Sequence, residues 1–203
     1  MIVNKVTDLI GNTPLFEVKM KNNDWKVFLK LEKFNPGGSM KDRMALNMIE
    51  QAEKDGRLKP GGTIIESSSG NTAIGLAIAS AIKGYRFIAV VDHHASKEKI
   101  DMIKAYGGEI VVVGDGYKAN EVAVIEREKT AKRMAEEIEN SFFPNQADNF
   151  DNRSAYVNTL AKELINELST IDSFYAAIGT GGSSCGTAIG LKENNQNTII
   201  NVI

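Results

Sequence analysis

The stretch TIIESSSGNTAIGLAIASAIKGYRFIAVV, from Thr63 to Val91, contains a strand, a helix and a second strand in direct succession. Thr63–Ile65 is a short β-rich run. The small-residue segment after Asn71 has helical character until Gly84, a residue type that commonly ends helices. Phe87–Val91 is a continuous apolar run, as in a buried strand. This order predicts a parallel α/β unit, because parallel strands need a crossover of such length.

The same alternation continues on both sides of this unit. The further expected elements are strands at 25–31, 109–113 and 174–178, and helices at 42–55, 119–138 and 154–168, with another helix capped by Ser96. Strands and helices in alternation indicate a parallel sheet with helices on both faces. Ligands of such sheets bind beyond the carboxyl ends of the strands. Two polar, glycine-containing loops have this position, Ser67–Asn71 and Gly179–Gly186.

The composition favours a globular protein that acts on small molecules. Of 203 residues, 42% are hydrophobic, and 24 Lys and Arg nearly balance 26 Asp and Glu. This balance favours neither nucleic acid nor a membrane surface as a partner. The single cysteine, Cys185, cannot form an internal disulfide and suits a reducing compartment. No signal-like start and no membrane-length apolar run are found in the sequence, so we expect a cytoplasmic protein.

The sequence stops on an apolar, strand-like run, NTIINVI, at 197–203. An exposed edge strand of this composition presents free backbone groups to other chains. We therefore expect that another chain covers this run or that the polypeptide is a fragment.

The first motif with chemical meaning is KLEKFNPGGSMKDR, from Lys30 to Arg43. A strand ends, the Asn-Pro-Gly-Gly segment turns the chain, and Lys41 stands at the start of a helix. A helix N-terminus and burial both disfavour the ammonium form of a lysine. Schiff-base chemistry needs the neutral amine. This context sets Lys41 apart from an ordinary surface lysine, although context alone does not decide its role.

Two further motifs are loops suited to anions. ESSSGNTAIGLA, at 66–77, offers hydroxyls, an amide and backbone N–H groups for a carboxylate or phosphate. A capping turn, in which Ser69 or Asn71 satisfies helix N–H groups, is the open alternative. GTGGSSCGTAIG, at 179–190, has Ser184 where a dinucleotide fingerprint needs glycine, and it lacks the lysine of a Walker loop. The phosphate of some other cofactor fits this loop best.

These motifs occur together with IGNTPL at 10–15, IKAYGGEIVVV at 103–113 and NQADNFDN at 145–152. In order and spacing they resemble the cysteine synthase (O-acetylserine sulfhydrylase) and cystathionine β-synthase family, fold type II enzymes that use pyridoxal 5′-phosphate (PLP). The resemblance implies an α/β fold of two parallel-sheet, three-layer domains, tryptophan-synthase-β-like, with the second incomplete in this chain. A smaller, mobile substrate domain would span 35–147, with 1–12 packed on it. A larger cofactor domain would comprise 13–34 and 148–203.

The resemblance also implies roles by position. Lys41 would hold the cofactor as a Schiff base and later move the substrate α-proton, and Asn71 would hydrogen-bond the ring hydroxyl. The residues for the substrate carboxylate would be Ser68, Ser69, Asn71, Thr72 and Gln146, and those for the cofactor phosphate Gly179, Thr180, Gly181, Gly182 and Ser183. The implied reaction is β-replacement on an activated L-serine, O-acetylserine or O-phosphoserine, through an aminoacrylate. A homodimer is implied as well.

Some residues differ from those usual in the family. Ser68 replaces a threonine and keeps the hydroxyl, whereas Ala147 and Phe150 replace an aromatic residue and a proline near the substrate pocket. The segments 37–40 and 90–96 look more like synthases that make a 2,3-diaminopropionate precursor from phosphoserine and glutamate. That activity is the main alternative. A serine/threonine dehydratase and a non-catalytic homologue, lacking the C-terminal cofactor contacts, are the others.

No metal site is expected. His93 and His94 are adjacent in front of a helix, and no carboxylate cluster follows them at ligand spacing. Cys185 has no histidine nearby in sequence that would activate it as a nucleophile. We expect a small packed side chain there.

Overall fold

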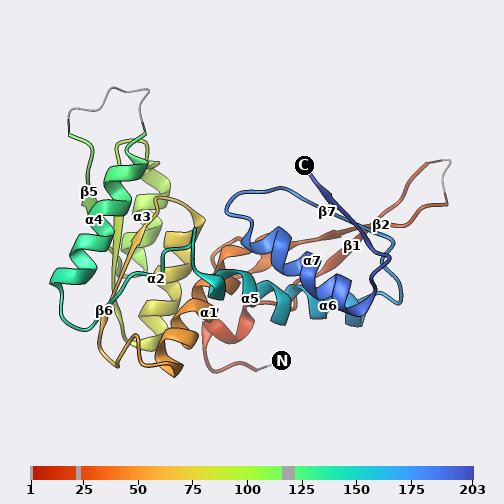
Figure 1. Cartoon of the computed structure of the whole chain (residues 1–203), viewed down its shortest axis with the longest axis horizontal. Helices are drawn as coiled ribbons and strands as arrows, with labels where there is room; N and C mark the ends of the chain where they lie inside the picture. Colours follow the sequence, from red (N-terminus) through yellow and green to blue (C-terminus); the bar gives the residue numbers. More distant parts are fainter. Residues whose placement is uncertain (1, 22–23, 116–121) are drawn as a thin grey trace.

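A four-stranded parallel sheet forms the centre of one lobe of the molecule (Figure 1). The computed structural model describes residues 2–21, 24–115 and 122–203. The strand order is β5-β4-β3-β6, and all neighbouring pairs run parallel. The bounds are β3 Thr63–Ser67, β4 Arg86–Val91, β5 Glu109–Val112 and β6 Ser141–Phe142. The parallel unit predicted from residues 63–91 is confirmed, with β3 and β4 side by side.

Helices cover both faces of this sheet. They are α2 Asn71–Lys83 and α3 Lys97–Ala105 on one face and α4 Val124–Glu137 on the other. Successive side chains of a strand point to opposite faces. Ile64 and Phe87 therefore share a core with α2, whereas Ile65 and Ile88 pack with Ala131 of α4. The three layers match the prediction. The predicted helix 119–138 begins at Val124, and its positions 119–121 lie outside the described residues.

The second lobe combines three helices with two small sheets (Figure 1). The helices are α5 Phe150–Asn158, α6 Leu160–Glu167 and α7 Gly182–Asn194. β7 Ser173–Ala176 pairs in parallel with β8 Ile199–Val202, so the apolar run at 197–203 has a neighbour within this chain. β1 Leu15–Val18 and β2 Val27–Lys30 form an antiparallel pair.

The predicted helix 154–168 differs from the observed structure at both its start and its middle. α5 begins earlier, at Phe150, because the Asn149 side chain caps it and accepts a hydrogen bond from the Asp151 N–H at 2.9 Å. Thr159, with φ −122° and ψ −76°, then separates α5 from α6. Its hydroxyl donates to the Ala155 carbonyl oxygen at 2.7 Å, a local bond that competes with regular helix geometry.

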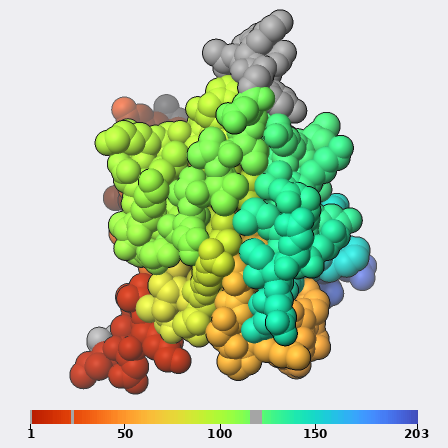
Figure 2. Space-filling model, turned by 90° about the vertical axis from the view of Figure 1, so that its left-hand side faces the viewer, coloured from red at the N-terminus to blue at the C-terminus, as the bar shows by residue number. Residues whose placement is uncertain are grey.

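Helix α1, Lys41–Lys54, lies between the two lobes (Figure 1). Ala45 and Ile49 pack into the core under the four-stranded sheet, and Met44 and Met48 pack with α5, α6 and α7. The short helix η2, Glu32–Phe34, precedes it, and η1, Val6–Leu9, contacts α2 at the foot of the sheet lobe (Figure 2). The division of the chain into domains at 35 and 147 stays a prediction.

The small sheets of the second lobe expose apolar side chains. Phe16 and Leu29 on β1 and β2, and Tyr175, Ile199 and Val202 on β7 and β8, are each about half exposed or more. Within the residues that the structure describes, no helix is long and apolar enough to cross a membrane.

Candidate active site

Lys41 is the first residue of α1 and follows the turn formed by Asn35–Gly38. Gly38 has φ +79°, a conformation that favours glycine, and its N–H donates to the Asn35 carbonyl oxygen at 2.8 Å. The Asp42 carboxylate accepts from the Gly37 N–H and ties this turn to the helix. Lys41 is half-buried, and burial lowers the pKa of its ammonium group. This lowering shifts the Lys41 equilibrium in the direction of the neutral amine that a Schiff base requires.

The loop at 68–70 joins the carboxyl end of β3 to the start of α2. Gly70 occupies the N-cap position of α2, so neither Ser69 nor Asn71 is the capping residue. The hydroxyl oxygen of Ser68 accepts from the Gly70 N–H at 3.2 Å, and Ser68 is buried, whereas Asn71 is exposed. This position, at the carboxyl end of a central strand and a helix N-terminus, suits an anionic ligand.

Gln146 is held against this loop from two sides. The Thr72 hydroxyl donates to the Gln146 side-chain oxygen at 2.6 Å. The buried Glu66 carboxylate accepts from the backbone N–H of Gln146 at 3.3 Å and from that of Ser67 at 2.9 Å. Burial raises the pKa of Glu66 to about 7, although both N–H groups favour its ionised form. One buried carboxylate thus joins the two segments predicted to bind the substrate carboxylate.

The glycine-rich loop after β7 leads directly into α7. Gly181, at φ +83°, is the N-cap residue, and Gly182 is the first residue of the helix. Gly179 and Thr180 are exposed, so this helix N-terminus is open to an anion. Beside it lies a cavity of about 200 Å³. Its lining includes Gln146, Ala147, Asp148, Asn149, Phe150, Asn152, Arg153, Thr180, Gly181, Gly182 and Cys185.

The predicted site residues are connected through contacts that the sequence did not indicate. Asn152 of α5 donates from its amide nitrogen to the Gln146 carbonyl oxygen at 2.7 Å and to the Thr180 hydroxyl at 3.2 Å. Tyr156, also on α5, donates to the carbonyl oxygen of Met40, directly before Lys41, at 3.0 Å.

Helices α1 and α2, which begin at Lys41 and Asn71, pack against each other. The residue types around them fit a phosphate-bearing aldehyde cofactor. Lys41 would supply the amine, and the Gly179–Ser183 backbone would supply donors for the phosphate. Asn152 is the last residue of the motif at 145–152. Membership of that motif is the one sequence signal that could have identified Asn152 as a site residue. No sequence signal indicated that Glu66 would connect the loop after β3 with Gln146.

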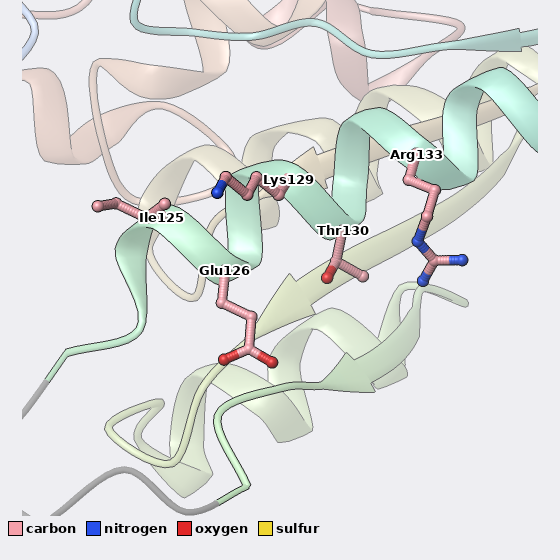
Figure 3. Close-up of a pocket in the computed structure, with 5 residues that line it drawn as sticks. All are labelled: Ile125, Glu126, Lys129, Thr130 and Arg133. Atoms are coloured by element: carbon pink, nitrogen blue, oxygen red, sulfur yellow. The ribbon is translucent and has the colours of Figure 1, made fainter.

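A second groove, of about 310 Å³, lies on α4, and its lining side chains all come from that one helix (Figure 3). They are Ile125, Glu126, Lys129, Thr130 and Arg133. None of the predicted site residues is among them. The rings of His93 and His94 have centroids 4.1 Å apart, and no group of three potential metal ligands occurs in the described ranges. Cys185 is exposed at the cavity beside α7, rather than packed as the sequence suggested.

An α/β fold with a half-buried lysine at one helix start and polar, glycine-containing loops at two others is compatible with a PLP enzyme. The family model described as "Pyridoxal-phosphate dependent enzyme" matches residues 6–203, so the chain belongs to this PLP-dependent family. The predicted resemblance to cysteine synthases is confirmed by curated relatives. A putative cysteine synthase of Sinorhizobium fredii is 48% identical over 96% of this chain. A probable cysteine synthase of Bacillus subtilis is 43% identical over the whole chain.

Solved structures agree with the fold prediction. A hydrogen sulfide-producing enzyme of Fusobacterium nucleatum superposes with a TM-score of 0.88, at 40% identity over 98% of this chain. An O-acetylserine dependent cystathionine β-synthase of Helicobacter pylori gives 0.89, at 35% identity over the whole chain. The chain covers 64% and 66% of these two proteins, and it spans 58% and 65% of the two curated relatives.

Proposed function

We propose that the chain carries the PLP site of a β-replacement enzyme that acts on an activated L-serine, as cysteine synthases do. The observation that supports this most is Lys41, a half-buried lysine at a helix start whose pKa is lowered by burial. The cofactor, when bound, supplies an electron sink for the substrate α-carbon. The relatives named cysteine synthase support the same reaction class.

In this proposal each residue keeps its predicted role. Lys41 holds the cofactor and transfers the α-proton, and Asn71 hydrogen-bonds the cofactor ring. The cradle for the cofactor phosphate is made by Gly179, Thr180, Gly181, Gly182 and Ser183, and the substrate carboxylate is held by Ser68, Ser69, Asn71, Thr72 and Gln146. The contacts of Thr72 and Glu66 with Gln146 support a common carboxylate site, since they hold its two segments together.

A second candidate activity is synthesis of a 2,3-diaminopropionate precursor from phosphoserine and glutamate. Arg127 of α4 supports it, because its guanidinium nitrogen Nη1 lies 3.5 Å from the Ser69 hydroxyl. A positive charge at this loop suits a substrate that carries a phosphate leaving group. The same nitrogen also lies 3.5 Å from the buried Asp92 carboxylate, which offsets part of that charge. O-acetylserine therefore remains the first choice of donor.

The deciding experiment is a visible absorption spectrum of the purified chain after PLP addition. We expect a band in the wild type that Lys41→Ala abolishes. The matched control is Lys54→Ala, at the exposed opposite end of the same helix, which should keep the band. A colourless wild type contradicts the proposal. O-acetylserine and O-phosphoserine are then added separately, and the donor that shifts the band identifies the leaving group. Sulfide and glutamate are added next, and the nucleophile that is consumed distinguishes the two activities.

Turnover is a separate question from cofactor binding. Product analysis with each donor distinguishes β-replacement from a dehydratase, which would release pyruvate. A coloured protein that makes no product supports the non-catalytic alternative. We also propose a cytoplasmic homodimer that binds small molecules, since the single cysteine and the exposed apolar side chains of β1 and β2 suit this. Sedimentation equilibrium tests the dimer.

A further inference from the structure

Gln146 is fixed at three of its polar atoms. Its N–H donates to Glu66, its side-chain oxygen accepts from Thr72, and its carbonyl oxygen accepts from Asn152 at 2.7 Å. The first two contacts are with Glu66 and Thr72, which lie on either side of the loop at 68–70, here called the substrate loop. The third leads elsewhere, because Asn152 also donates to Thr180 in the glycine-rich loop at 3.2 Å. The Asn152 amide therefore connects the glycine-rich loop, through Gln146, with the loop that follows β3.

The position of Asn152 leaves it little freedom. Its side chain is buried, with 2% of the residue exposed. A β-carbon at Gly182 would overlap the Asn152 amide, so only glycine at this helix start leaves room for the Asn152 side chain. The Gln146 carbonyl can only accept, which fixes the amide nitrogen of Asn152 toward it. The Asn152 oxygen is buried and has no hydrogen-bond partner among the described residues.

The hydrogen bonds that the Thr180 hydroxyl accepts leave its O–H free to donate to an anion. Its hydroxyl oxygen accepts from Asn152 at 3.2 Å and, more weakly, from the Gly182 N–H at 3.5 Å. A hydroxyl has two lone pairs and one hydrogen. With both lone pairs engaged, the O–H of Thr180 is the group left to donate to a bound phosphate. Hydrogen bonds in such a chain strengthen one another.

We propose that Asn152 is a positioning residue that couples the glycine-rich loop to the substrate loop. An anion at Gly179–Ser183 polarises the Thr180 hydroxyl and strengthens its bond with Asn152. This fixes the orientation of the amide whose second N–H holds Gln146, and so orders Gln146 for the second anion. The coupling itself is a property of the two loops. That the anions are a cofactor phosphate and a substrate carboxylate rests on the proposed function.

The first test measures the affinity of Asn152→Ala for PLP, with the visible band as the readout. The loss of one neutral hydrogen bond to the loop predicts an affinity weaker by about threefold to tenfold. Asn47→Ala is the matched control. Asn47 also donates from its amide to two groups around α5, the Asp151 carbonyl at 2.7 Å and the Ser154 hydroxyl at 3.0 Å, but not to either loop. It should destabilise the fold comparably and leave PLP affinity unchanged.

The second test needs neither PLP nor turnover. Inorganic phosphate is titrated into the apo chain while backbone amide resonances are recorded. We expect phosphate to shift Gly181 and Gly182 directly and Gln146 through Asn152. In Asn152→Ala the two glycine shifts should persist and the Gln146 shift should vanish, whereas Asn47→Ala should keep all three.

Several results would overturn the coupling. They are an unshifted Gln146 or unshifted glycines in the wild type, an unchanged Gln146 response in Asn152→Ala, and an equal loss in Asn47→Ala. The titration is repeated in Lys41→Ala, which cannot attach a cofactor but keeps both loops. A coupling that persists there shows that it does not depend on an attached cofactor. A coupling in a wild-type chain that never becomes coloured with PLP shows that the proposed function has failed and the coupling has not.

Discussion

The buried guanidinium of Arg43 joins α1 to η2 and to α6 of the second lobe, and its replacement by methionine should strongly destabilise the chain. Arg43 is fully buried and makes paired hydrogen bonds to two carboxylates. Its Nε and Nη2 bind Glu32 at 2.7 and 2.8 Å, and Nη2 also binds Glu163 of α6 at 2.8 Å. Lys30 adds a second positive charge, 3.0 Å from Glu163. Without Arg43, Glu32 loses its ion pair and Glu163 keeps only its contact with Lys30.

The size of the effect follows from this imbalance. Removal of one partner of a buried ion pair costs about 3–5 kcal/mol, because the remaining charge stays desolvated. The pKa of Glu163 provides a second measure. Burial alone would raise it, but hydrogen bonds from Arg43, the Asn12 backbone and Lys30 lower it to about 2 from 4.5. Stability from Glu163 is thus present above pH 4.5 and lost as pH falls toward 2, by about 3 kcal/mol.

Urea unfolding followed by circular dichroism, in a series from pH 2 to pH 7, measures both effects. Arg43→Met should lower the free energy of unfolding at pH 7 and should also remove most of the acid-side loss. Arg43→Lys keeps the positive charge but loses the paired hydrogen bonds. Its free energy of unfolding should therefore lie between those of the wild type and Arg43→Met. The matched control is Arg86→Met, whose bidentate pair with Glu109 is half exposed and worth at most about 1 kcal/mol. A loss in Arg43→Met no larger than in the control, or an unchanged acid dependence, refutes the reasoning.

Three further outcomes are expected. Gly186→Ala should lower stability by about 1–3 kcal/mol in urea unfolding, because its β-carbon would overlap the Arg153 carbonyl of α5. Gly179→Ala, with no atom within 4 Å, is its control, and equal losses contradict the packing argument. Glu66, with a pKa raised by burial to about 7, should make stability fall by about 3 kcal/mol between pH 4.5 and 7. A Glu66→Gln variant that keeps the same slope contradicts this. Ser96→Ala should cost about 1 kcal/mol by loss of the α3 cap, and an unchanged melting temperature contradicts it.

Much of the sheet lobe could be predicted because its signals are local. The apolar run Phe87–Val91 and the glycine at 84 define a buried strand and a helix end without reference to distant residues. The helix start at Lys41 was equally readable, since the Asn35–Gly38 turn precedes it. Alternate side chains of these strands then face the two opposite cores, although both central strands are buried throughout most of their length.

Other features were beyond local patterns. The break at Thr159 depends on a side-chain bond that competes with the helix. The antiparallel partner of β2 is β1, which was not among the expected strands. Neither feature was predicted, because secondary-structure propensity depends only on the residues of one segment. The pairing of a strand and the interruption of a helix also depend on what the segment contacts.

The sequence by itself determined which groups are available for the chemistry: a lysine at a helix start, and two loops of hydroxyls, amides and glycines. Only the tertiary structure decided how they act together. Asn152 lies 6 residues from Gln146 and 28 from Thr180, and Arg43 lies 120 residues from Glu163. No periodicity encodes such contacts. They form because packing α1, α5 and α7 together buries polar groups that must then find partners.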